Sequence, residues 1–138
     1  MSQIIVSSNI NRLAKIYDYI NKELDHYDIS ISIRLQIEFV IEEVFTNVIK
    51  YGYCSRDENV KIIYNIESLK IEIKFLSEGT KFNPFVKVSP EVSLTAKDRG
   101  IGGLGMLLIK NNADNIYYEY NDNTNILTVI KKLRDQVN

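Results

Sequence analysis

One stretch of the chain, residues 36–52, has an apolar pattern that indicates a buried helix. Its apolar residues recur every three or four positions, which at about 100° per residue places them on one side of an α-helix. The resulting stripe is wide, as expected of a helix that is covered by the rest of a core. Its members are Ile37, Val40, Ile41, Val44, Phe45 and Val48. The other elements of the chain must therefore cover this helix.

Two polar residues lie at the edge of this stripe. Glu43 and Asn47 are one turn apart, so their side chains emerge on the same face, beside Gln36, whereas Glu42 points to nearly the opposite side. Polar groups at the rim of a core face are costly unless they have a partner. That partner is more often a backbone group or a water than a ligand. The helix alone leaves both interpretations open.

Length and composition restrict the class of protein. A chain of 138 residues suits one domain, residues 1–138, with a real core. The net charge is −1, without a cluster of basic residues, so a nucleic-acid partner is not expected. The start of the chain does not resemble a signal peptide, and no apolar run has the length of a membrane span. Cys54 is the only cysteine, which favours a reducing cytoplasm and argues against structural zinc.

The remaining elements follow from hydrophobic periodicity. A short strand at 3–6 is followed by a helix from Ile10 to about His26, and the central helix begins at Ser30 or Ser32. Strands at 60–66 and 70–77 alternate apolar and polar residues around a tight turn, which places Ser77 on the inner face and Glu78 on the outer face. A hairpin of residues 115–133 closes the chain. This order predicts an α+β two-layer sandwich, a mixed and largely antiparallel sheet with helices on one face.

A long segment with little periodicity, residues 79–103, precedes a short helix expected at 106–110. Loops of this length in a compact domain usually carry function. The segment ends in a glycine-rich turn that opens the helix, and such turns bind anions because backbone amides and the helix dipole favour negative charge. It lacks the lysine of a P-loop and the parallel βαβ unit of a dinucleotide fingerprint. Alone, the glycines suit a flexible turn equally well.

Together these features resemble the ATPase superfamily of gyrase, heat-shock chaperones, histidine kinases and MutL (GHKL, or Bergerat, fold). Glu43-x-x-x-Asn47 resembles its N-box, residues 77–84 resemble its Asp-x-Gly-x-x-Phe-x-Pro box, and residues 100–105 resemble its second glycine box. The short loop and the closing pattern from Asp114 to Leu127 are similar to those of the small anti-sigma factor serine/threonine kinases. The resemblance covers the chain from about Gln36 to Leu133.

The resemblance implies a role for each matching residue. Glu43 matches the general base, Asn47 the residue that completes the Mg²⁺ shell, and Gly79 the glycine beside the adenine. Lys97 and Arg99 lie in the loop that would cover the phosphates, although exposed loop charges are as often only solvated. The residues so assigned to ATP or ADP are Asn47, Ser77, Gly79, Phe82, Lys97, Arg99, Gly100, Gly102, Gly103, Leu104 and Gly105.

Two residues depart from the family pattern. Ser77 stands where relatives have the aspartate that accepts a hydrogen bond from the adenine amino group. A hydroxyl does this more weakly or through water, which predicts an affinity reduced about ten- to hundredfold. Glu78 points outward and is not expected to substitute. Tyr51 stands where relatives usually carry histidine, and the sequence does not indicate the effect.

Two functions of different classes follow from the resemblance. The first is an ATP- and Mg²⁺-dependent serine/threonine kinase that binds a sigma factor or related regulator and phosphorylates an anti-anti-sigma antagonist of the STAS type. The second is a binding module without catalysis on the same fold. The Glu43 and Asn47 pair and the retained glycines favour the first, whereas Ser77 favours the second. The resemblance also implies a homodimer.

Overall fold

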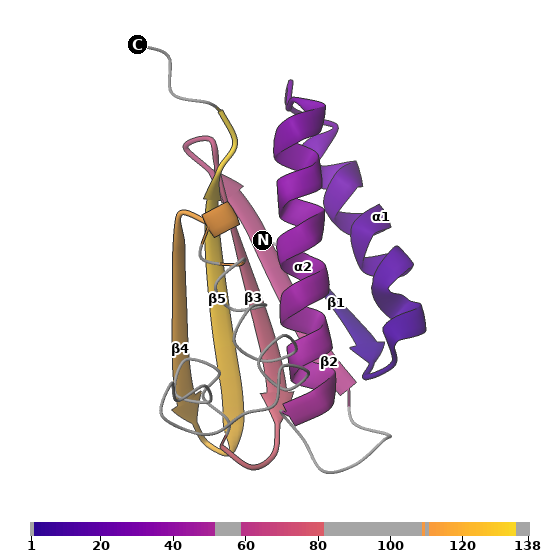
Figure 1. Ribbon diagram of the computed structural model, residues 1–138, viewed down its shortest axis with the longest axis vertical. Coiled ribbons are helices and arrows are strands. Elements are labelled where there is room, and N and C mark those ends of the chain that lie inside the picture. The colour runs from indigo at the N-terminus through magenta and orange to yellow at the C-terminus, as the bar shows by residue number, and fades with distance from the viewer. Residues whose placement is uncertain (1, 52–58, 82–108, 110, 135–138) are drawn as a thin grey trace, which may run out of the picture.

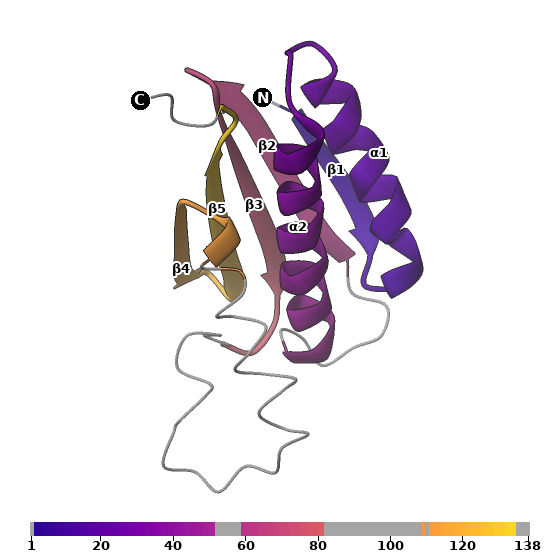
Figure 2. The ribbon, with the colours of Figure 1, turned by 45° about the horizontal axis from the view of Figure 1, so that its top comes forward.

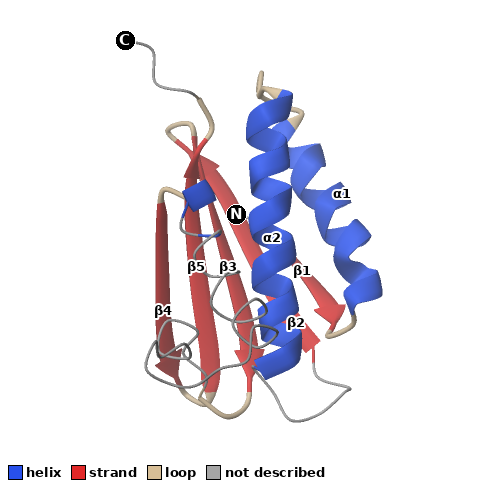
Figure 3. Cartoon of the chain, in the orientation of Figure 1, coloured by secondary structure: helices blue, strands red, loops and turns tan. Residues whose placement is uncertain are grey.

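A computed structural model describes residues 2–51, 59–81, 109 and 111–134. The strands form one five-stranded sheet in the order β1-β2-β3-β5-β4, and the paired strands of the described chain are all antiparallel. Both long helices lie on the same face of this sheet (Figures 1 and 3). The elements are β1 Ser2–Ser7, α1 Leu13–Leu24, α2 Ile31–Tyr51, β2 Asn59–Glu67, β3 Lys70–Glu78, β4 Asn115–Asn121 and β5 Thr124–Lys132. The expected α+β two-layer sandwich is confirmed.

The first helix differs in detail from the expectation. Residues Ile10–Arg12 form a 3-10 turn, which Asn9 caps by accepting from the amide of Asn11, and α1 then runs only to Leu24. The expected start of this helix at Ile10 differs from the structure, because Ile10 lies in the 3-10 turn and is exposed, and the buried face of α1 begins at Ile16. The 3-10 turn has three residues per turn, so a period of 3.6 counted from Ile10 places the face wrongly.

The central helix α2 agrees with the sequence pattern. Ser30 accepts a hydrogen bond from the amide of Ile33 at 3.2 Å, which satisfies one of the unpaired amides of the first turn. All members of the predicted apolar stripe are buried. The N-cap and the stripe together account for where this helix begins and which face it turns to the sheet.

The two hairpins form at two-residue turns. Ser68 and Leu69 join β2 to β3, and Asp122 and Asn123 join β4 to β5, all with positive φ angles between 52° and 61°. Two successive positive φ angles define the hairpin turn whose twist matches the strands. Asn and Asp tolerate this conformation readily, whereas Ser and Leu do so at a cost.

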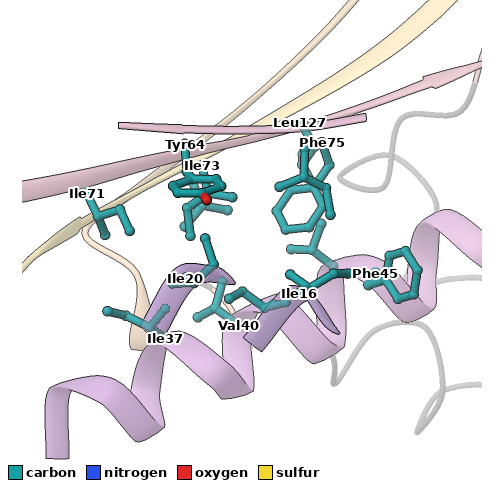
Figure 4. Close-up of a cluster of buried hydrophobic side chains, with 14 of the residues drawn as sticks. Ile16, Ile20, Ile37, Val40, Phe45, Tyr64, Ile71, Ile73, Phe75 and Leu127 are labelled. Atoms are coloured by element: carbon teal, nitrogen blue, oxygen red, sulfur yellow. The ribbon is translucent and has the colours of Figure 1, made fainter. Parts of the chain in front are cut away.

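The core lies between the inner face of the sheet and the helices. Figure 4 shows Phe75 and Leu127 pointing from the strands toward α2, with Ile16 and Val40 between the layers. These residues belong to one cluster of buried side chains that extends from β1 to β5. Ile109 of the segment before β4 joins it and is fully buried. A single core thus fixes α2 against the middle of the sheet.

A polar cluster holds α1 against α2. Arg34 contacts Asp25 at 2.9 Å and donates to Asn21 at 3.2 Å, while Asn21 donates to the carboxylate of Glu38 at 3.0 Å. The hydroxyl of Tyr17 donates to the backbone carbonyl of Glu38 at 3.3 Å. Burial, and then the nearby carboxylates, raise the pKa of Tyr17 to about 12, so this phenol keeps its proton at neutral pH. The cluster orients the two helices relative to each other.

The topology brings three chain segments to one edge of the molecule. The C-terminal end of α2, the end of β3 and the start of β5 lie together at the lower edge in Figures 1 and 2. Within the described residues, no helix has the length and apolar character that crossing a membrane requires. Asn47, Ser77 and Gly79, the described residues that the sequence assigned to a ligand, lie at this edge.

Candidate functional site

Ser77 is the last inward residue of β3. The strand alternates as predicted, with Ile71, Ile73 and Phe75 buried before it and Glu78 exposed after it. Ser77 is 2% exposed, and its hydroxyl oxygen makes no hydrogen bond to any described residue. A buried polar atom without a partner is uncommon, because it loses its water without compensation. Ser77 therefore leaves an unsatisfied hydroxyl at this end of β3.

Asn125 of β5 stands directly opposite Ser77 in the sheet register. It is 5% exposed, its side-chain oxygen accepts from the hydroxyl of Tyr118 at 2.5 Å, and its amide nitrogen donates to the carbonyl of Thr80 at 3.0 Å. Asn125 and Tyr118 are not among the site residues that the sequence predicts. The available signal was an asparagine at an inward position of β5, in line with Leu127 and Val129.

Asn47 reaches the same place from α2. It is 6% exposed, and its side-chain nitrogen donates to the carbonyl of Glu43, one turn earlier, at 2.9 Å. The bond holds the carboxamide in one orientation on the helix. The same carboxamide also has a carbonyl oxygen, and such an oxygen is a suitable ligand for a hard cation. The structure thus confirms that a backbone group is one partner of Asn47, and the metal role of Asn47 stays a prediction.

These side chains line a small cavity between α2 and the sheet. Its volume is about 10 Å³, which suits about one water molecule. The lining residues are Asn47, Val48, Phe75, Ser77, Tyr118, Asn125 and Leu127. A nucleotide base is larger than this cavity. Asn47 and Ser77, two of the residues that the sequence assigned to a ligand, nevertheless line the same cavity.

Glu43 lies one turn before Asn47 and is partly buried. Burial raises the pKa of its carboxyl group above the ordinary value, the charge of Glu42 raises it further, and Lys50 opposes both. Glu42 is exposed, as the helix geometry predicted. The described lining of the cavity does not include Glu43. A carboxylate with a raised pKa accepts a proton more readily than an ordinary one.

Gly79 follows β3 and is hydrogen-bonded to the hairpin of β4 and β5. Its amide donates to the carbonyl of Asn123 at 2.9 Å, and its carbonyl accepts from the hydroxyl of Tyr120 at 2.9 Å. Its φ angle of 143° lies in a region that other residues avoid. Gly79 also lines an open hollow of about 600 Å³ formed with Glu78, Thr80, Lys81, Tyr120 and Asn123. The role of Gly79 beside an adenine stays a prediction.

The other predicted site residues lie outside the described part of the chain. These are Phe82, Lys97, Arg99, Gly100, Gly102, Gly103, Leu104 and Gly105. The anion-binding turn therefore remains a prediction from sequence. The short helix expected at 106–110 is described only at Ile109, which is helical together with residues 111 and 112. The side chain of Tyr51 is likewise not described.

Known proteins share both sequence and fold with this chain. A 96-residue stretch is 26% identical to the serine-protein kinase RsbW of Listeria monocytogenes and 25% identical to that of Listeria innocua. The stretch covers 66% of this chain and 61% of each relative, so the chain matches less than two thirds of their length.

Solved structures show the same fold at lower identity. The RsbU and RsbW domains of Rv1364c from Mycobacterium tuberculosis match with a TM-score of 0.64 at 11% identity, over 96% of this chain and 33% of that one. The catalytic domain of the histidine kinase ThkA matches with a TM-score of 0.55 at 12% identity, over 96% and 97% of the two chains. These structures support the fold alone. The family model of the histidine kinase-like ATPase domain matches residues 6–131, and the chain belongs to that family.

Proposed function

We propose that the chain binds ATP with Mg²⁺ and acts as a serine/threonine protein kinase of the anti-sigma factor type. Its partners would be a sigma factor or related regulator, which it holds, and an anti-anti-sigma antagonist of the STAS type, which it phosphorylates. The observation that carries the proposal is the meeting of Asn47 and Ser77 at one cavity, with Glu43 one helical turn away. The likeness to RsbW, named a serine-protein kinase, supports it.

The chemistry of each residue suits this reaction. The side-chain oxygen of Asn47 would hold Mg²⁺, which when bound neutralises phosphate charge and commonly uses only one or two protein ligands. Glu43 would accept the proton of the attacking serine hydroxyl as its oxygen bonds to the γ-phosphorus and ADP leaves. Its raised pKa brings the carboxylate closer to the pH at which it must act.

Calorimetric titration tests nucleotide binding. Mg²⁺-dependent binding of ADP and ATP at micromolar concentrations is expected for the unmodified protein, and Asn47→Ala is expected to remove the dependence on Mg²⁺. Tighter binding by Ser77→Asp would place the base at Ser77. If the unmodified protein does not bind nucleotide, the kinase proposal fails, even where Ser77→Asp recovers binding.

Transfer of label from γ-labelled ATP to a purified anti-anti-sigma protein tests the kinase step. Glu43→Gln is expected to bind nucleotide normally and to lose about 10²–10⁴-fold in transfer rate, the range typical of a lost general base. Equal rates in Glu43→Gln and the unmodified protein would remove Glu43 from that role.

A second function is favoured by the narrow cavity and by Ser77. A binding module that keeps the fold and the partner surface but not the reaction would have no need for an open nucleotide pocket. Weak or absent nucleotide binding without transfer to any antagonist, combined with capture of the sigma factor, would support this function. We further propose that the chain acts in the cytoplasm as a homodimer. Strand β1 lies at an edge of the sheet and is one edge at which two copies could pair. Sedimentation equilibrium tests the homodimer.

A further inference from the structure

The cavity beside Ser77 contains few polar atoms that remain able to recognise a ligand. Asn125 uses its oxygen for Tyr118 and its nitrogen for Thr80. Asn47 uses its nitrogen for the carbonyl of Glu43. The hydroxyl of Ser77 is buried and makes no hydrogen bond to a described residue. On the β3 side of the cavity, Ser77 is therefore the group that a bound base edge meets.

A hydroxyl recognises hydrogen-bonding groups differently from a carboxylate. It carries one donor and two acceptor lone pairs, and its hydrogen rotates to suit the partner, whereas an ionised carboxylate only accepts. The cavity next to Ser77 fits about one water molecule, which also donates or accepts. The described lining of the cavity contains no acidic side chain. The described lining therefore does not require the ligand to present a hydrogen-bond donor.

This difference bears on which purine the site takes. Adenine presents a donor amino group at C6 and an acceptor at N1, whereas hypoxanthine presents an acceptor oxygen at C6 and a donor N1–H. An aspartate at position 77 that faces C6 would accept from the amino group of adenine and would repel the C6 oxygen of hypoxanthine. Serine can accept from the amino group or, after rotation, donate to the oxygen.

We infer that Ser77 makes the nucleotide site tolerant of both 6-amino and 6-oxo purines, so that inosine and adenosine nucleotides bind with similar affinity. The inference rests on the proposed nucleotide binding and adds the class of base that the site accepts. Ser77 is the specificity-determining residue, because its neutral hydroxyl can either donate or accept a hydrogen bond. The described geometry that supports it is the cross-strand position of Ser77 against Asn125, whose own hydrogen bonds are already made.

Competition between ADP and inosine diphosphate tests the inference, because the two differ only at C6 and N1 of the base. The measured quantity is the ratio of their dissociation constants at fixed Mg²⁺. For the unmodified protein the ratio is expected to stay within about threefold, since each nucleotide finds one neutral hydrogen bond. For Ser77→Asp the ratio is expected to favour ADP by about ten- to hundredfold, as a charged acceptor implies.

Two further variants separate the role of the hydroxyl from general effects. Ser77→Ala removes the group without adding charge, and it is expected to weaken both nucleotides alike and to leave the ratio near that of the unmodified protein. Glu78→Gln changes the charge of the next residue, which is exposed on the outer side of β3, and is expected to leave the ratio unchanged. The unmodified protein and Ser77→Ala keep the test decisive even if Ser77→Asp does not fold.

The outcomes distinguish this inference from the proposed function. Binding of both nucleotides with a ratio near one supports the inference. Binding of ADP with rejection of inosine diphosphate by more than about tenfold in the unmodified protein overturns the inference and leaves nucleotide binding intact. Absence of binding for both nucleotides, in all variants that fold, overturns the inference together with the proposed function.

Discussion

At the scale of single residues, the side chains on the inner face of the sheet change from apolar to polar at the end of β3 and the start of β5. Ser77 and Asn125 face each other across β3 and β5 where the preceding inward residues, Phe75 and Leu127, are apolar. Two buried polar side chains in register cost stability unless each is satisfied. Asn125 is satisfied by Tyr118 and Thr80, whereas Ser77 finds no described partner. The contrast gives Asn125 a structural role and leaves Ser77 as the unsatisfied polar group on which the proposed ligand role rests.

The link between Tyr118 and Asn125 gives a prediction for stability. Asn125→Ala is expected to lower the free energy of unfolding by about 1–3 kcal/mol, because buried groups lose their partners. Tyr118→Phe is expected to cost about 1 kcal/mol through loss of the hydroxyl. Denaturant unfolding of both variants and of the double variant measures the coupling, expected at about 0.5 kcal/mol or more. Strictly additive effects would contradict the hydrogen bond.

The raised pKa of Glu43 predicts a dependence of stability on pH. Because folding raises this pKa, the proton binds more tightly to the folded state, so the resulting stabilisation is present below the ordinary value of 4.5 and is lost as pH rises through the raised pKa. Glu43→Gln avoids that loss. Its free energy of unfolding, relative to the unmodified protein, is expected to be higher at pH 7 than at pH 4.

Denaturant unfolding at the two pH values checks this prediction. Glu119→Gln is the control, since it removes a carboxylate from an exposed position of β4. A relative stability of Glu43→Gln that is lower at pH 7 than at pH 4 would show that the folded state favours the ionised carboxylate, contrary to the burial of Glu43.

At the scale of elements, the sequence predicted what depends on periodicity and caps. The stripe of α2 and the inward position of Ser77 follow from local pattern alone, and the pattern limited the cap of α2 to Ser30 or Ser32, of which the structure has Ser30. The face of α1 was partly missed because the 3-10 turn at Ile10–Arg12 shifts the period. Asn125 and Tyr118 were missed because their role arises from strand register across β3, β5 and β4, and register between distant segments is not readable from one strand.

The two hairpin turns permit a comparison at this scale. Ser68 and Leu69 hold the same positive φ conformation as Asp122 and Asn123 without the side chains that favour it. Replacing Ser68 and Leu69 by Asn and Gly is expected to raise the free energy of unfolding by about 1 kcal/mol. Asp122→Asn in the other turn is the control and is expected to change it by less than about 0.5 kcal/mol. Thermal unfolding of the two variants checks both, and destabilisation by the first would contradict the turn assignment.

At the scale of the whole molecule, one core joins the helices to the sheet and so positions the site. Ile41 is 0% exposed at the centre of α2, whereas Leu35 on the same helix is 58% exposed. Ile41→Ala is expected to lower the free energy of unfolding by about 2–5 kcal/mol. Leu35→Ala removes similar apolar volume from the surface and is expected to change it by less than about 0.5 kcal/mol. Equal losses in urea unfolding would show that Leu35 is covered, for example by a second copy of the chain.

The assembly of the site is also a property of the whole molecule. α2 supplies Asn47, β3 supplies Ser77, and the hairpin of β4 and β5 fixes Gly79. The family resemblance in the sequence indicated that the first two would meet, and the fold brings them to one cavity. The width of that cavity was not predictable, because it depends on how side chains from four elements pack together.

The central claim is that a nucleotide binds where α2, β3 and β5 meet, and backbone amide NMR during titration with Mg²⁺ and ADP tests it most directly. The claim predicts saturable chemical-shift changes that are largest at Asn47, Ser77, Gly79 and Asn125, with small changes at Ile31 and Leu35 at the opposite end of α2. Saturable changes confined to the end of α2 at Ile31 and Leu35, or no changes at millimolar ADP, would contradict it.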